Sequence, residues 1–431
     1  MHPRTLTHPI RRTRPMVKRT AQDIRRSNRF DALRRVYAAP GEASRQDIAA
    51  ATGLSFATVA NLVAELIEAD VLVEAGHEDS GGGRPRARLA VNAGRGALLG
   101  VDVAETAVQA QLFDLELRVL GDVELPLSGE RVRPADVVDA IVTAVEHLLA
   151  ASGTPPSRVL GVGVSVPGPV EREGGVSVFS PYWSWREVPL RALLAERLAM
   201  PLYLDNPLKA ATVAEMWFGA GRDVDDLVVV TLRGGVGAGI AVGGTLYRGA
   251  TNSAGEWGHT CLVLDGRECR CGKKGCVEAY VSTAGVARTV RELDPEGALL
   301  REGDETEAVD VLARAAAAGD PVAVEAVART ARYLGAAVAN LLNLFNPQTL
   351  VIGGPTAERL GERLLSRTRE AAADHALPQS LRAAELRLST VPDNPVALGA
   401  ATFALEGFLD DRETFGSVKA GRRAARSRAA S

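Results

Sequence analysis

The side chains best suited to metal chemistry gather in one segment, GEWGHTCLVLDGRECRCGKKGC, which ends at Cys276. It supplies the imidazole of His259 and the thiols of Cys269 and Cys271 beside that of Cys276. Three thiolates and one imidazole complete the tetrahedral shell of a structural zinc and leave no position for a catalytic water. All four cysteines lie here, and in a reducing compartment such clustering favours a metal over disulfides. The sequence therefore predicts a structural zinc at these four residues, with Cys261 as a buried core thiol.

A second informative segment, RQDIAAATGLSFATVANLVAEL, has the pattern of a helix-turn-helix. Ser44 is expected to cap a helix over 45–52, Gly53 to supply the positive φ of the turn, and Ser55 to cap a second helix. The exposed start of the second helix in such a pair enters the major groove of DNA. Serine, threonine and asparagine bond phosphates or base edges there, and Phe56 can contact a thymine methyl group.

A hairpin with strands near 71–75 and 88–91 is expected next along the chain, which completes a winged helix. Its loop, HEDSGGGRPRAR, is flexible and then basic, and Gly-Arg-Pro can place an arginine in the minor groove. A three-helix packing module that binds no nucleic acid is the alternative. The residues expected to contact DNA are Arg45, Gln46, Ser55, Phe56, Thr58, Asn61, Arg84 and Arg86.

The overall charge of −3 means that any DNA binding must come from a local basic patch. Residues 1–27 and 416–431 are basic and lack a hydrophobic period, which predicts two disordered tails, either solvated or in auxiliary contact with phosphates. A secretory signal and an apolar run of about 20 residues are both missing from the sequence. We therefore expect a cytoplasmic protein with no membrane partner.

Beyond residue 97, strands and helices alternate and glycines come after several strands, as at Pro167-Gly168-Pro169 and Gly353-Gly354. This pattern is typical of nucleotide-binding α/β folds. The zinc segment, with Glu278 after its last cysteine, resembles the signature of the ROK family (repressors, open reading frames and sugar kinases). The stretch 232–256 is similar to the family's second phosphate loop and the segment after it, and VIGG at 351–354 is similar to its adenosine-side strand.

The resemblance covers residues 28 to about 407 and implies a winged helix joined to a two-lobed body. The body is expected to have the actin-like, ribonuclease H-like ATPase fold, so the fold class is α/β. The expected parts are the winged helix at 28–92, a first lobe at 97–205 completed by a C-terminal helix at 396–408, and a second lobe at 206–395 that carries the zinc loop.

The resemblance also implies a sugar site. In the family, the glutamate and histidine of a Glu-x-x-Gly-His run and the glutamate after the last cysteine contact the sugar. These positions are Glu256, His259 and Glu278 here, and Asn206 is a further retained contact. Tyr182, however, stands where the family usually has a sugar-contacting asparagine. The nearby Trp183 and Trp185 either stack on a sugar or fill the core.

The residues that a ROK kinase needs for phosphoryl transfer are altered. Its general base is an aspartate in an acidic-Asn-Asp-x-Asn run, and Pro207, which cannot accept a proton, stands at that position. The first phosphate loop, usually Asp-x-Gly-Gly-Thr, lacks glycines at 102–106, and Glu105 would repel a phosphate. Arg233 replaces a glycine of the second loop, and Lys209 replaces a polar sugar contact. We therefore expect a degenerate kinase, not an enzyme.

The expected function is that of a DNA-binding transcriptional regulator, a repressor as in most of the family. It would act as a homodimer or tetramer on a double-stranded, pseudo-palindromic operator and bind a sugar or sugar derivative as effector. An ATP-dependent hexose kinase with a DNA-binding extension is one alternative. A ligand-independent regulator, whose body serves only for dimerisation, is the other.

Overall fold

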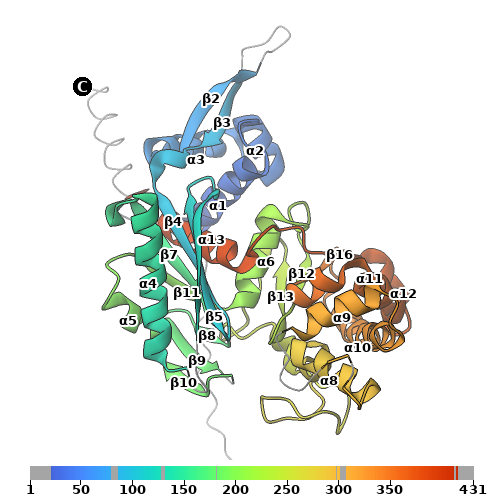
Figure 1. Ribbon diagram of the computed structural model, residues 1–431. Helices are drawn as coiled ribbons and strands as arrows, with labels where there is room; N and C mark the ends of the chain where they lie inside the picture. The colour runs from blue at the N-terminus through green and yellow to red at the C-terminus, as the bar shows by residue number, and fades with distance from the viewer. Residues whose placement is uncertain are drawn as a thin grey trace, which may run out of the picture.

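The computed structural model describes residues 21–78, 86–127, 132–180, 182–297, 299–300, 307–411 and 414–415. A three-helix unit with a projecting hairpin lies on a larger body that contains two five-stranded sheets (Figure 1). This mixed α/β architecture confirms the expected fold class. No helix in the described part of the chain is long and apolar enough to cross a membrane.

The N-terminal unit has the helix and strand order of a winged helix. Its elements are α1 (Ala21–Ala38), β1 (Ala43–Ser44), α2 (Arg45–Thr52), α3 (Phe56–Glu68), β2 (Leu72–Glu78) and β3 (Arg86–Val91). Ser44 and Ser55 cap α2 and α3, and Gly53 ends α2 with a φ of 67°. The two hairpin strands are longer than the predicted 71–75 and 88–91, because a bulge after Glu74 lets β2 continue to pair with β3.

The expectation of a disordered tail up to residue 27 was wrong for its last part, because α1 begins at Ala21. The basic residues there are paired within the protein. Arg25 and Arg29 both form ion pairs with Glu65, which is only 3% exposed. Arg26 pairs with Asp410 at 2.9 Å. A buried carboxylate needs such compensation, so these arginines fix α1 against its neighbours instead of remaining in solvent. The first 20 residues and the predicted tail at 416–431 lie outside the described residues.

The first lobe is a sheet covered by one long helix on each face. Its elements are β4 (Ala97–Val103), β5 (Ala107–Asp114), β6 (Val119–Pro126), α4 (Pro134–Ser152), β7 (Val159–Ser165), β8 (Val170–Glu171), β9 (Val176–Ser180), β10 (Trp185–Val188), α5 (Leu190–Ala195), β11 (Leu202–Asp205) and the C-terminal α13 (Pro395–Asp410). The large sheet has the order β11-β7-β4-β5-β6. Side chains of β4 alternate between the faces, so Leu98 joins the core beneath α13 and Leu99 the core beneath α4.

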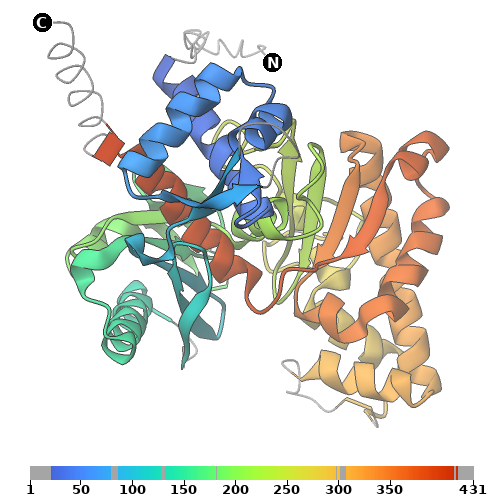
Figure 2. The same cartoon turned by 90° about the horizontal axis from the view of Figure 1, so that it is seen from above.

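Helix α13 approaches the sheet so closely that two strand positions must be glycine. A Cβ at Gly100 would lie 1.9 Å from the carbonyl oxygen of Ala397, and one at Gly163 would lie 1.7 Å from that of Ala400. The helix runs between the two lobes, as the view from above shows (Figure 2). It extends slightly beyond the expected 396–408.

The second lobe repeats the plan of a sheet between helices. Its elements are α6 (Pro207–Phe218), β12 (Leu227–Leu232), β13 (Val236–Val242), β14 (Thr245–Leu246), α7 (Glu278–Val281), α8 (Thr283–Leu293), α9 (Ala308–Ala317), α10 (Pro321–Phe345), β15 (Thr349–Gly353), α11 (Pro355–Ala373), α12 (Pro378–Ala383) and β16 (Glu385–Leu388). The sheet order is β14-β13-β12-β15-β16. Val228 and Val230 face the core of α10 and α11, whereas Val229 faces the core that contains α6.

The winged helix is joined to the body by a shared hydrophobic core. Residues of α1 and α6 belong to the same buried cluster. The rings of Phe30 and Trp217 lie 4.6 Å apart, and those of Tyr37 and Trp217 lie 5.4 Å apart. The hydroxyl of Tyr37 also donates a hydrogen bond to the carbonyl of Leu115 in the first lobe. Movement of α6 would therefore be transmitted directly to α1.

Candidate functional site

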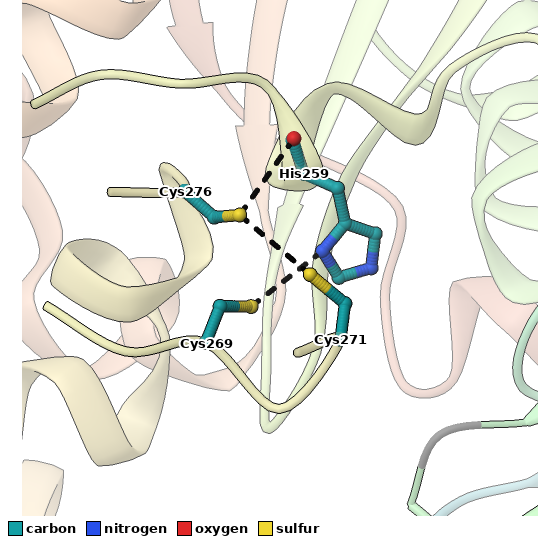
Figure 3. A group of neighbouring side chains, drawn as sticks. All are labelled: His259, Cys269, Cys271 and Cys276. Carbon is teal, nitrogen blue, oxygen red and sulfur yellow. Dashed lines mark hydrogen bonds between the residues drawn. The ribbon is translucent and has the colours of Figure 1, made fainter. Parts of the chain in front are cut away.

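The four predicted metal ligands lie together, and their ligand atoms are all within 4.8 Å of one another (Figure 3). Cys269 Sγ lies 3.7 Å from His259 Nδ1, and Cys271 Sγ lies 3.7 Å from Cys276 Sγ. In a tetrahedral site with zinc–sulfur bonds of about 2.3 Å, neighbouring sulfurs would be about 3.8 Å apart. The spacing and the donor set therefore fit zinc.

The loop that presents these ligands depends on two tight turns and one buried arginine. Gly272 and Gly275 have φ values of 83° and 74°, and a Cβ at Gly275 would lie 1.8 Å from the carbonyl oxygen of Val263. Arg267, 7% exposed, donates to the carbonyls of Ala279 and Gly285 and pairs with Glu292 at 2.7 Å. Sequence reasoning missed Arg267, whose place among other arginines gave no sign of burial.

Cys261 was predicted to be a buried core thiol, and this prediction was wrong. The residue is exposed. It lies at the edge of the zinc loop, where its backbone forms an isolated antiparallel bridge with Cys276. The bridge holds the backbone of Cys261 at the surface, so that its side chain is not directed into the core.

The predicted effector residues Asn206, Glu256, His259 and Glu278 all line one cleft between the lobes. We call it the interlobe cleft; it encloses about 1080 Å³ of empty space, part of which is open to solvent. The first lobe contributes Glu105, Pro167 to Pro169, Phe179 and Tyr182, and the second contributes Leu208, Arg233 and Arg270. Its wall combines apolar surface with a few charged groups, as small-molecule sites do.

Asn206 is held in place at the start of α6. Its Oδ1 accepts a hydrogen bond from the backbone nitrogen of Lys209 at 3.1 Å and so caps the helix. The preceding Asp205 is also fixed, because Oδ1 accepts from Asn252 at 3.0 Å and Oδ2 pairs with Arg248. The N-terminal end of α6 is therefore tied to the segment that leads to Glu256.

A buried cation, Lys209, and a half-buried carboxylate, Glu256, lie beside the cleft. Lys209 is 1% exposed, and within the described residues its Nζ has no hydrogen-bond partner. Burial lowers the pKa of Lys209, and the nearby carboxylates of Asp205 and Glu256 oppose this change. Burial raises the pKa of Glu256, against the opposing effect of His259 and Lys209. Of the two, Glu256 lines the cleft, where its carboxylate is available to a ligand.

Glu278 connects the zinc loop to the second lobe's sheet. Its Oε2 accepts from the backbone nitrogen of Val236 at 3.0 Å, while Oε1 lies 3.5 Å from Cys269 Sγ. The metal cluster and the wall of the cleft are therefore parts of one structure, and a change in one would disturb the other.

The two tryptophans near Tyr182 belong to the core. Trp183 and Trp185 are 7% and 4% exposed, and their ring centroids lie 4.6 Å apart with an interplanar angle of 41°. Trp185 donates its indole N–H to the carbonyl of Val132 at 2.9 Å. Of the two roles left open by the sequence, filling the core is the one that the structure supports. Tyr182 is the aromatic residue of this group that lines the cleft.

Arg233 lines both the interlobe cleft and a second cavity near Gly353 and Gly354, which has about 760 Å³ of empty space, part of it open to solvent. Its guanidinium pairs with Asp102 at 2.8 Å and so joins the second lobe to the first. Asp102 and Glu358 line this second cavity, beside the end of the strand that resembles the family's adenosine-side strand. Pro207 occupies the first turn of α6, where a general base would be needed.

The predicted DNA-contact residues lie on the surface of the winged helix. Gln46, Ser55, Phe56, Asn61 and Arg86 are exposed, with Phe56 54% accessible. The hydroxyls of Ser55 and Thr58 bond to each other at 2.8 Å as part of the α3 cap. Arg45 pairs with Glu74 at 2.9 Å, a partner that sequence reasoning did not identify. Arg84 lies outside the described residues.

Comparisons of the sequence and the structure with known proteins agree on one family. The model of the ROK family matches residues 98–406. The chain is 30% identical over 372 residues to the xylose repressor of Caldicellulosiruptor bescii, covering 85% of this chain and 92% of the repressor. It is 32% identical over 308 residues to the glucokinase of Halalkalibacterium halodurans, covering 70% of this chain and 92% of the kinase.

A solved structure extends the likeness to the N-terminal unit. The crystal structure of a ROK family transcriptional regulator, a homologue of the E. coli MLC protein, superposes with a TM-score of 0.72 at 26% identity. The match covers 89% of this chain and 98% of that one. The protein belongs to the ROK family.

Proposed function

We propose that this protein is a transcriptional repressor that binds a DNA operator through its winged helix and a sugar or sugar derivative in its interlobe cleft. The observation that carries the proposal is the attachment of a capped helix-turn-helix with a wing to a ROK body through a shared core. The length of the match to repressors also supports it. The likeness to the xylose repressor extends over 372 residues, against 308 for the glucokinase.

The body is proposed to have lost phosphoryl transfer while retaining the cleft. Loss of a general base alone costs on the order of 10²–10⁴ in rate. Pro207 cannot serve as that base, and Glu105, in a first phosphate loop without glycines, would repel a phosphate. The Arg233–Asp102 ion pair further ties the lobes together at this point.

The proposed zinc is structural. With all four ligands from the protein it has no open position, and its role is to hold the loop that carries His259 and the neighbouring cleft residues. It supplies no chemistry to a reaction.

Communication between the sites is proposed to run along α6. Its first residues line the cleft, and Trp217 near its last turn packs against α1. A ligand that binds better to one position of α6 shifts the population of α1 orientations, and hence the affinity for DNA. If the protein acts as a homodimer, two half-sites would be read and their spacing would be fixed by the dimer.

Selection of bound fragments from genomic DNA tests the proposal. One or a few sites should be enriched, and a mobility-shift titration of each should show a steep dependence on salt. Addition of single sugars and sugar derivatives should weaken binding to the selected site for at least one compound. Failure to bind any fragment, together with ATP-dependent phosphorylation of a hexose that requires Glu256, would overturn the proposal in favour of a kinase.

A further inference from the structure

The wing of the N-terminal unit contains a bulge that turns two polar residues toward the helices. Glu74 of β2 lies opposite Leu89 of β3, and His77 lies opposite Ala87, so β2 has one residue more than β3 between these pairs. Gly76, within the bulge, has a φ of 98°. In a regular strand Glu74 and His77, three positions apart, would point to opposite faces of the hairpin; the bulge places them on one face.

That shared face lines a hollow between the wing and the first turns of α2 and α3. The hollow, called the wing hollow below, is lined by Arg45, Gln46, Phe56, Glu74, His77 and Arg86, together with two small residues. Among the described residues that line it, Glu74 is the one acid. Four of the predicted DNA contacts therefore surround a carboxylate.

The carboxylate of Glu74 holds Arg45 in one orientation. Arg45 Nη2 lies 2.9 Å from Glu74 Oε1, and the side chains are 24% and 46% exposed. Arg45 is also the first residue of α2, where the helix dipole disfavours a positive charge. Glu74 offsets that unfavourable interaction. The pairing also favours one orientation of the guanidinium.

An acid at this place has an electrostatic cost for DNA binding in general. Phosphates within about 8–10 Å of Glu74 are repelled, whatever the base sequence. An arginine engaged with Glu74 also has less freedom to contact phosphates non-specifically, whereas a fixed planar guanidinium suits a defined pair of acceptors. A carboxylate paired with an arginine in this way lowers the affinity for all DNA. It raises the ratio of the affinity for the operator to the affinity for other sequences.

We propose that Glu74, acting through Arg45, is a positioning residue that sets the sequence specificity of this protein for duplex DNA. The inference rests on the proposed DNA-binding function, because it assigns to Glu74 a role in limiting that binding. Glu74 suppresses sequence-independent binding, and the wing bulge is the element that places it there.

The test compares the wild type with Glu74→Gln, in which the charge is removed and the shape kept. Affinities are measured by fluorescence anisotropy for a duplex selected from genomic DNA and for a scrambled duplex, each over a salt series. For Glu74→Gln, affinity for the scrambled duplex should rise at least about threefold, and the preference for the selected duplex should fall. The salt slope on scrambled DNA should steepen by about one, because Arg45 gains a phosphate contact.

Glu42→Gln is the matched control, because Glu42 is exposed in the same unit and does not line the wing hollow. It should leave the specificity ratio unchanged. Arg45→Lys, which keeps the charge but loses the planar fork, should lower the ratio without steepening the salt slope. Thermal unfolding of each variant shows whether it still folds. If Glu74→Gln does not fold, the specificity ratio of Arg45→Lys provides the test.

The outcomes separate the two proposals. A wild-type protein that binds neither duplex removes the proposed function itself. A wild-type protein that prefers the selected duplex, with the same preference in Glu74→Gln and Arg45→Lys, overturns only the role assigned to Glu74.

Discussion

The two ends of α6 differ in how completely their polar groups are satisfied. At the C-terminal end, Trp217 is buried against Phe30 and Tyr37, and the carbonyl of Met216 accepts a hydrogen bond from Arg34 at 2.8 Å. At the N-terminal end, Asn206 caps the helix, but the ammonium of Lys209 is buried without a hydrogen-bond partner within the described residues. One end is packed like a protein core, and the other lines the cleft with Asn206, Pro207 and Leu208.

This difference indicates which part of the molecule should respond to an effector. A close-packed aromatic junction resists deformation, so α1 and the end of α6 are expected to move as one body. The start of α6 lies in the interlobe cleft, where a ligand can change its hydrogen bonds and charge environment. Disruption of the packed end should therefore cost stability, and changes at the cleft end should mainly alter the response to ligand.

The largest effect is expected from Trp217→Ala. Removal of a buried indole from a core costs about 3–5 kcal/mol of unfolding free energy, measured by urea denaturation. Because this core is shared by α1 and α6, the variant should also bind the operator with the effector no longer changing its affinity. Leu344→Ala, at a residue 76% exposed near the end of α10, is the control and should change stability by less than about 0.5 kcal/mol. A stability change as small as that of the control would show that the junction is not close-packed.

Removal of zinc should have the next largest effect on stability. It would act on the wall of the interlobe cleft that faces the start of α6. At free zinc a hundred times its Kd, metal binding would stabilise the fold by about 2.7 kcal/mol, and a chelator should remove this increment. Burial raises the pKa of the Cys269 and Cys276 thiols, so metal binding must release protons and weaken as the pH falls. Metal analysis should give one zinc per chain, and Cys276→Ser should abolish it. Equal thermal unfolding with and without chelator would argue against a structural metal.

Arg34→Ala tests the polar part of the packed end. Arg34 donates to the carbonyls of Met216, Gly221 and Arg222, at 2.8, 3.5 and 3.2 Å. Loss of these charged hydrogen bonds should cost about 2 kcal/mol of unfolding free energy and reduce the effect of ligand on DNA affinity. Arg35→Ala removes the same charge from the adjacent position and is the control. Equal losses in both variants would mean that the contact to α6 is not what matters.

Short-range features were the ones that could be predicted from the sequence. The zinc ligands lie within one loop, and the caps at Ser44 and Ser55 act on residues three positions away. The sheet-and-helix order of the body was likewise evident from local patterns.

The features that were missed depend on residues distant in the chain. Arg25 pairs with Glu65, 40 positions away. Because nothing near Arg25 indicates this partner, the predicted disordered tail extended too far, to residue 27. Arg233 pairs with Asp102 across 131 positions, and nothing near either residue indicates this ion pair. The pairing of Arg45 with Glu74 depends on a bulge whose register is fixed only when the two wing strands meet. Long-range ion pairs and burial therefore required the structure.

The smallest stability effect, with the sharpest functional contrast, is expected from Asn206→Ala at the cleft end of α6. Loss of an N-cap costs about 1 kcal/mol of unfolding free energy. The substitution also removes a polar group from the cleft, so the effector should bind at least about tenfold more weakly, while affinity for the operator without effector should change little. Asp320→Ala is the matched control, since Asp320 caps α10 by accepting from the backbone nitrogen of Ala323 at 2.9 Å and does not line the cleft. It should lose the same stability and keep its response to ligand. An unchanged ligand response in Asn206→Ala would mean that the start of α6 is not where the effector acts, and the contrast between the two ends would then concern stability alone.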